Sequence, residues 1–217
     1  AKGKASLDKI RERGENWLVQ ATPSVSRTID HIASAVDESE IYFDQMDAGT
    51  GDFFLPAMLH DVERTFGSYV RGEATILANF TGNGKTAWAL QEAVDKARRG
   101  YGVLYVSVEV YRKVLVERLI SHVMQINYTQ VQYGWKQRHI DEGMPYSCPD
   151  NETFRRLRKE GQEQLRELPI HFMARSRDPR TGYVTSPTFT PSGIRTEIRN
   201  YAEKHKIDFV VLGYITK

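Results

Sequence analysis

The sequence predicts an α/β protein with a mainly parallel sheet, preceded by an N-terminal helical linker segment. Short runs of consecutive apolar residues recur along the chain, and stretches with the spacing of amphipathic helices separate them. Continuous apolar strands that alternate with helices are typical of parallel sheets covered on both faces. The expected strands are residues 74–78, 103–108, 170–174 and 207–213.

Residues 1–52 are expected to form the N-terminal segment. Residues 7–20 carry apolar side chains on roughly one helical face. A threonine and a proline open a second expected helix over residues 22–36, as an N-cap and a first-turn residue. The acidic and small residues that follow indicate a linker, so the globular domain is expected over residues 53–217. The apolar face of the second helix must be buried somewhere, for example against a neighbouring subunit.

Helices are expected between the strands of the globular domain. The first begins at Lys85 and ends at Gly100, where basic residues favour the helix dipole and glycine supplies a left-handed cap. Apolar spacing marks the next helix over residues 115–126, and a polar helical stretch covers residues 151–167. A threonine followed by Pro191 caps the last helix.

The composition suits a globular protein of a reducing compartment. The chain has 217 residues, a formal net charge of +2 and a single cysteine, Cys148. One cysteine excludes an intramolecular disulfide, and the small net charge excludes nucleic-acid binding through the bulk field of the molecule. No apolar stretch approaches the roughly 20 residues of a membrane helix, and the N-terminus does not resemble a secretory signal. The expected location is the cytoplasm, without a membrane partner.

Residues 76–90, "ILANFTGNGKTAWAL", suggest a phosphate-binding loop. The pattern is G-x-x-x-x-G-K-[ST] between a strand and a helix, with Asn79 in place of the first glycine. Asparagine accepts a left-handed backbone more readily than most residues do. The alternative is an ordinary strand-to-helix turn. The candidate nucleotide-binding residues are Asn79, Phe80, Thr81, Gly82, Asn83, Gly84, Lys85 and Thr86.

Two side chains of this loop have specific expected roles. Lys85 is expected to reach the β- and γ-phosphates and so to act in catalysis, while the Thr86 hydroxyl is expected to hold Mg²⁺. The implied cofactors are therefore ATP and Mg²⁺. Glu109 follows the strand 103–108 at its carboxyl end, the edge at which open α/β sheets bind ligands. It could orient the attacking water, or it could be a solvated acid at the start of a helix.

Several segments together resemble the C-terminal ATPase domain of DnaB-type replicative DNA helicases, bacterial or phage. The resemblance covers residues 53–217, with a divergent middle at 128–166. The segments that carry it are "YVRGEATILANFTGNGKTAWALQEAV" (69–94), "GVLYVSVEVYRKVLVERLIS" (102–121), "ELPIHFMA" (167–174), "TPSGIRTEIRNYAEKH" (190–205) and "IDFVVLGYITK" (207–217).

The resemblance implies a RecA-like P-loop NTPase fold and an ATP-dependent helicase that forms a homo-oligomer, a hexamer, on single-stranded DNA. It implies that Lys85 and Thr86 contact phosphate and Mg²⁺ and that Glu109 is the catalytic glutamate. Residues 7–36 would be the linker that holds adjacent subunits together. A primase or a helicase loader is a further implied partner, in the cytoplasm of a bacterium or a phage-infected host. The family domain continues beyond the last strand, so residues 53–217 are expected to be incomplete at the C-terminus.

The last strand departs from the family pattern. The family has an aspartate that holds Mg²⁺ at the Walker B position, where this chain has Gly213 followed by Tyr214. Asp208 cannot replace it, because five residues along a strand span about 16 Å. We therefore expect nucleotide binding to survive and hydrolysis to be weakened. Either the chain is an ATPase-weakened variant, natural or engineered, which we favour, or its metal is held differently.

Two other functional classes stay open at this stage. One is a recombinase-like or KaiC-like regulatory ATPase of the RecA family. The other is an assembly subunit that binds nucleotide and scarcely hydrolyses it, which Gly213 favours. The basic residues of 154–167 are interpreted as a solvated helix face, in preference to a contact with a phosphate backbone. Arg175, Arg177 and Arg180 are interpreted as part of a long mobile loop, with contact to a partner subunit or to nucleic acid as the alternative. The histidines lack metal-ligand spacing, which argues against a zinc site.

Overall fold

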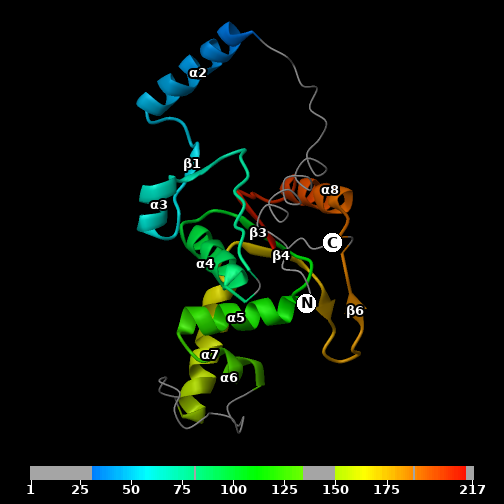
Figure 1. The fold of residues 1–217 in the computed structure, drawn as a ribbon. Helices are drawn as coiled ribbons and strands as arrows, with labels where there is room; N and C mark the ends of the chain where they lie inside the picture. The colour runs from blue at the N-terminus through cyan, green and yellow to red at the C-terminus, as the bar shows by residue number, and fades with distance from the viewer. Residues whose placement is uncertain (1–30, 81, 134–149, 188, 214–217) are drawn as a thin grey trace, which may run out of the picture. The chain divides into compact units, whose positions relative to one another are not determined.

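The computed structural model describes residues 31–80, 82–133, 150–187 and 189–213 (Figure 1). Backbone contacts divide the chain into two compact units, residues 1–78 and residues 79–217. Each unit is described by itself. None of the helices in the described parts is both long and apolar enough to cross a membrane.

The first unit begins with helix α2 (Ile32–Asp47), whose N-cap His31 accepts a hydrogen bond from the Ala33 amide at 3.2 Å. Helix α3 (His60–Phe66) follows, together with an antiparallel pair of strands, β1 (Phe54–Leu55) and β2 (Tyr69–Val70). The expected helix over 7–20 and most of the one over 22–36 lie outside the described residues. No described residue of α2 is buried.

Helix α2 extends through residues that the sequence pattern had assigned to a linker. That prediction was wrong for residues 37–47, which are helical. Acidic residues alone do not end a helix, because glutamate is a good helix former. The helix ends where glycine enters the sequence, and Gly49 has a left-handed backbone with φ of 64°.

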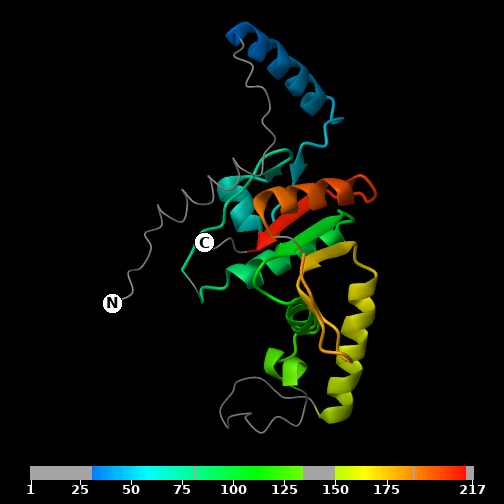
Figure 2. The same cartoon turned by 90° about the vertical axis from the view of Figure 1, so that its right-hand side faces the viewer.

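The second unit contains a parallel sheet of three strands, in the order β4 (Ile170–Ala174), β3 (Val103–Ser107), β7 (Phe209–Gly213). The helices between them are α4 (Lys85–Arg98), α5 (Arg112–Met124), α6 (Tyr128–Tyr133), α7 (Asn151–Arg166) and α8 (Pro191–Ala202). Helices lie on both sides of the sheet (Figure 2). The predicted α/β class with a parallel sheet is confirmed.

Strand β3 is the centre of the core, and all five of its residues are buried. Val103 and Tyr105 form one apolar cluster with residues of α4 and α5. The register places Ser107, the last residue of β3, opposite both Ala174 and Gly213. The carboxyl ends of all three strands therefore meet at one edge.

Residues 74–78, which the sequence predicts to be a buried strand, form no strand in the structure. Ile76 is 42% exposed and Leu77 is 52% exposed. An apolar β-branched run favours an extended backbone, but a strand also needs a neighbouring strand to satisfy its amides and carbonyls. No described strand pairs with these residues.

The predicted long loop at 175–193 contains a hairpin of two short strands, β5 (Ser176–Arg177) and β6 (Val184–Thr185). Its turn is closed by Asp178, whose carboxylate oxygen accepts hydrogen bonds from the amides of Arg180 at 2.7 Å and Thr181 at 3.0 Å. The chain then enters α8 at Pro191, as predicted, with Thr190 as the N-cap.

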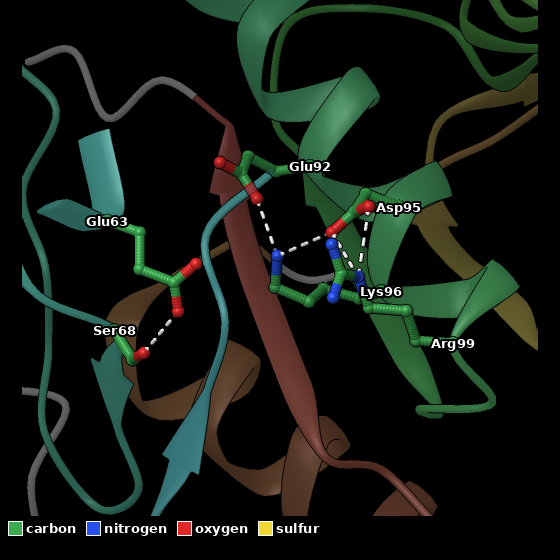
Figure 3. Close-up of polar contacts among 6 residues, drawn as sticks. All are labelled: Glu63, Ser68, Glu92, Asp95, Lys96 and Arg99. Atoms are coloured by element: carbon green, nitrogen blue, oxygen red, sulfur yellow. Dashed lines mark hydrogen bonds and ion pairs between the residues drawn. The ribbon is translucent and has the colours of Figure 1, made fainter. Parts of the chain in front are cut away.

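Helix α4 contains a buried ion pair (Figure 3). The Lys96 ammonium lies 2.7 Å from a carboxylate oxygen of Glu92 and 3.1 Å from one of Asp95, and Lys96 and Glu92 are 0% and 2% exposed. Arg99 contacts Asp95 at 3.0 Å. Charges buried so deeply are tolerated because they are paired.

We expect Lys96→Ala to lower the free energy of unfolding by about 3–5 kcal/mol, because it removes the buried cation that lies between the carboxylates of Glu92 and Asp95. Lys96→Met combined with Glu92→Gln removes both charges and is expected to cost clearly less. Urea unfolding followed by circular dichroism measures the difference. Lys159→Ala removes an exposed lysine paired with Glu163 and is the control, with an expected change below about 1 kcal/mol. Equal losses for Lys96→Ala and the control would contradict the prediction.

Candidate nucleotide-binding site

Two glycines shape the loop before α4. Gly82 has φ of 90° and Gly84 has φ of 78°, a left-handed conformation that side chains with a Cβ atom rarely adopt. A Cβ atom on either glycine would meet nothing within 4 Å, so the backbone conformation, rather than crowding, requires glycine.

The N-terminus of α4 is not capped by a side chain. Gly84 is the N-cap, and the first helical hydrogen bond beyond it runs from the Trp88 amide to the Gly84 carbonyl at 2.9 Å. The amides of Thr86 and Ala87 have no acceptor among the described residues. Free amides at a helix N-terminus, with the positive end of the helix dipole, favour a bound anion.

Lys85 lies folded over the loop. Its ammonium donates hydrogen bonds to the carbonyl oxygens of Asn79 at 2.7 Å and Phe80 at 2.8 Å. These are neutral acceptors, and hydrogen bonds between a cation and a charged phosphate oxygen are stronger. A phosphate group at the N-terminus of α4 can therefore draw the ammonium away from the two carbonyls.

Asn79 braces the loop with its side chain. Its Oδ1 atom accepts hydrogen bonds from the Phe80 amide at 2.8 Å and the Asn83 side chain at 2.9 Å. Its backbone is not left-handed, because Gln125 is the only described residue other than glycine with positive φ. The expectation that Asn79 was tolerated for a left-handed backbone was wrong. It replaces glycine by contributing hydrogen bonds across the loop.

The metal assignment stays a prediction. Thr86 is half-buried in the first turn of α4, beside the free amides. Thr81 lies outside the described residues. In the part of the chain that the structure describes, no group of three or more acidic, histidine or cysteine side chains could hold a metal by itself. A Mg²⁺ ion here would need nucleotide phosphates among its ligands, as is usual for this ion.

Glu109 is exposed, two residues after the end of β3. The turn that carries it is held by Ser107, whose hydroxyl donates to the Val110 carbonyl at 3.0 Å and accepts from the Val110 amide at 3.1 Å. Ser107 was not among the predicted site residues, although a serine between a strand and a helix is a recognisable turn signal. Because Ser107 pairs with Gly213, Glu109 follows the same sheet edge at which β7 ends.

Gly213 lies against Tyr105. A Cβ atom on Gly213 would lie 3.2 Å from the Val106 carbonyl oxygen, 3.3 Å from Cε1 of Tyr105 and 3.4 Å from its hydroxyl oxygen. The Tyr105 side chain therefore reaches from the middle of β3 to the last residue of β7. The sequence offered no signal for this contact, since a tyrosine in a buried strand usually packs in the core.

Tyr105 is 1% exposed, and burial raises the pKa of its hydroxyl from 10.0 to about 12, with a smaller opposing effect of Arg118. The hydroxyl is therefore neutral at physiological pH. It places a dipole, rather than a negative charge, beside Gly213.

A family model described as "DnaB-like helicase C terminal domain" matches residues 55–217. No curated protein matches the chain. A solved structure of a DnaB-like replicative helicase, determined with its interactions with primase, matches with a TM-score of 0.53 and 14% identity. The match covers 96% of this chain and 54% of that one, so this chain spans about half the length of that protein. At this identity the likeness shows a shared fold.

The pKa of Tyr105 predicts a pH dependence of stability. The unfolded chain loses this proton near pH 10, whereas the folded chain keeps it to about pH 12. Its stabilising contribution is complete below pH 10 and falls as pH rises toward 12, by about 1 kcal/mol at pH 11. Urea unfolding between pH 8 and pH 11 should show a steeper decline for the unsubstituted chain than for Tyr105→Phe. Parallel declines would disprove the assignment.

Proposed function

The chain belongs to the family of DnaB-like helicase C-terminal domains, and from this premise we propose that it is the ATP-binding motor core of a hexameric replicative DNA helicase that moves on single-stranded DNA. The observation that carries the proposal is the loop between Asn79 and Thr86. Its left-handed glycines, its free helix amides and the Lys85 ammonium are the parts with which proteins bind a triphosphate.

The proposed roles follow from the chemistry of each group. The amides at the start of α4 and Lys85 hold the phosphates, and Lys85 offsets the charge that develops at the γ-phosphate. Thr86 supplies a hydroxyl ligand to Mg²⁺, which in turn screens the phosphate charges. Glu109 orients the attacking water, because it is an exposed carboxylate at the sheet edge where nucleotides bind in such folds.

Gly213 weakens hydrolysis in this proposal. It has no side-chain oxygen, and the neighbouring Tyr105 hydroxyl is neutral. A neutral hydroxyl orients water but does not balance the charge of a divalent cation. Nucleotide binding is retained, because the loop supplies most of the contacts to the phosphates.

We propose the rest of the assembly on the same basis. Residues 1–52 form the linker segment, and residues 53–217 belong to the ATPase domain. Helix α2 exposes large apolar side chains, including Ile32 at 71% and Ile41 at 61%, which suits burial against an adjacent subunit of the ring. The partners are single-stranded DNA and a primase or a helicase loader, in the cytoplasm of a bacterium or a phage-infected cell.

A second candidate function is favoured by Gly213 alone. In it the chain is an assembly subunit in which bound ATP stabilises an interface and is scarcely hydrolysed. Both functions require nucleotide at the same loop. They differ in whether turnover rises when a carboxylate is restored at the end of β7.

Lys85→Ala is expected to weaken binding of ATP with Mg²⁺ at least tenfold, because it removes the one cation of the loop that meets the phosphates. Isothermal titration calorimetry measures the affinity, and circular dichroism confirms that the variant is folded. Lys113→Ala is the matched control, since Lys113 also lies in the first turn of a helix but is paired with Glu117. An unchanged affinity of Lys85→Ala for ATP would contradict the proposed nucleotide-binding site.

Gly213→Asp is expected to raise ATP turnover tenfold or more, which corresponds to about 1.4 kcal/mol of barrier. The new Cβ atom would lie 3.4 Å from the Tyr105 hydroxyl oxygen, which the double variant Gly213→Asp, Tyr105→Phe removes, while the contacts with the Tyr105 ring and the Val106 carbonyl oxygen remain in both variants. Gly213→Ala adds the same crowding without a carboxylate and is the control. Steady-state phosphate release is the measurement. Nucleotide binding without any gain in turnover in either aspartate variant would select the assembly function.

A further inference from the structure

The hairpin β5–β6 and the start of α5 form a basic surface, which we call the arginine hairpin. Its four arginine side chains are all exposed. They are Arg112, Arg175, Arg177 and Arg180. Both views show the hairpin extending away from the parallel sheet (Figures 1 and 2).

The charges of the arginine hairpin are not neutralised within the described part of the chain. None of its guanidinium groups forms an ion pair with a described carboxylate. The one acid of the hairpin, Asp178, is occupied by its own turn, where hydrogen bonds from the amides of Thr181 and Arg180 lower its pKa. Asp178 therefore stays ionised but is committed to the backbone.

Two basic residues of α7, in contrast, form ion pairs. Arg156 contacts Glu160 at 3.3 Å and Lys159 contacts Glu163 at 3.8 Å, each one turn along the helix. Such pairs cancel charge locally, as on an ordinary solvated helix. Arg155 and Arg166 of the same helix are exposed and, like the arginines of the hairpin, form no ion pair with a described carboxylate, so only part of the basic charge of α7 is cancelled.

An aromatic side chain belongs to the same hairpin. Tyr183 directly precedes β6 and is 70% exposed, although a tyrosine usually buries most of its ring. The hairpin is held in one shape by the bond from the Asp178 amide to the Tyr183 carbonyl, at 2.9 Å, and by the strand pair above it. An exposed ring on a fixed support offers a flat surface at low entropic cost.

The arginine hairpin is fastened to the edge of the sheet that bears Glu109. The Arg112 amide donates to the Arg175 carbonyl at 2.9 Å, and the Arg112 guanidinium donates to the Ser176 hydroxyl at 2.7 Å. Arg175 directly follows β4, whose last residue pairs with the last residue of β3. The hairpin is therefore connected by hydrogen bonds to the start of α5, which follows the turn that carries Glu109.

We propose that the arginine hairpin binds single-stranded DNA, with its guanidinium groups on the phosphate backbone and Tyr183 stacked on a base. Unpaired arginines beside an exposed aromatic ring match the two features of such a ligand, a regular line of phosphates and unstacked bases. An acidic protein surface would satisfy the charges but would leave the ring without a matching flat partner. The inference rests on the proposed function, because that function supplies the single strand.

The test is binding of a fluorescently labelled oligothymidylate to the full chain, followed by anisotropy over a range of salt concentrations. The double variant Arg177→Ala, Arg180→Ala is expected to bind about tenfold more weakly. Its slope of log K against log salt should be shallower by roughly 1.4, since each phosphate contact on a single strand contributes roughly 0.7. Tyr183→Ala should weaken binding at least fivefold without changing the slope, whereas Tyr183→Phe keeps the ring and should bind normally.

The matched control is the double variant Arg156→Ala, Lys159→Ala, which removes two basic residues that are already paired. It should leave affinity and slope unchanged. Equal losses in the control and the hairpin variant, or no saturable binding by the unsubstituted chain, would overturn the inference. So would hairpin variants that bind DNA normally but fail to oligomerise in sedimentation, since the surface would then be a subunit interface. ATP affinity in the same variants reports separately on the proposed function.

Discussion

The register of β3 against its two neighbours is the constraint on which the site depends. It places Ser107, Ala174 and Gly213 side by side, so the segments after all three strands leave the sheet at one edge. The segments that carry Glu109, the arginine hairpin and the end of β7 therefore start from the same edge of the sheet. The buried side chains of β3 hold the register, because a slip of one residue would move Tyr105 to the opposite face of the sheet and away from the cluster that it packs in.

The loop before α4 is held in shape by hydrogen bonds among its own residues. A lysine near free helix amides experiences repulsion from the positive end of the dipole, and here Lys85 is drawn instead to the carbonyls of Asn79 and Phe80. Asn79 ties the same stretch through its side chain. The loop is thus ordered by neutral acceptors. In the proposed nucleotide site a phosphate would replace them with charged acceptors, so binding would exchange hydrogen bonds in a loop that is already ordered.

Local signals explain what could be predicted from the sequence. The start of α4, the buried strand β3 and the Thr190-Pro191 entry to α8 each depend on residues within one or two turns, and all three are as expected. The prediction of a strand at residues 74–78 was wrong, because a strand also depends on a partner strand that can lie far along the chain. The contact of Tyr105 with Gly213 could not be predicted for the same reason. It depends on the register between β3 and β7, which the spacing of residues along the sequence does not determine. The prediction for Asn79 considered only its backbone preference, whereas its side chain accepts two hydrogen bonds within the loop.

The formal net charge of +2 had argued against nucleic-acid binding through the bulk field, and it says little about binding through local charge. Ion pairs one helical turn apart partly cancel the charges of Arg156 and Lys159 on α7, because each cation lies next to a carboxylate. Arginines on a hairpin of two-residue strands lack such partners, since alternate residues point to opposite faces and the turn acid is used by the backbone. Charge balance over the whole chain therefore coexists with a local excess of positive charge, and only the fold decides which basic residues remain free to bind.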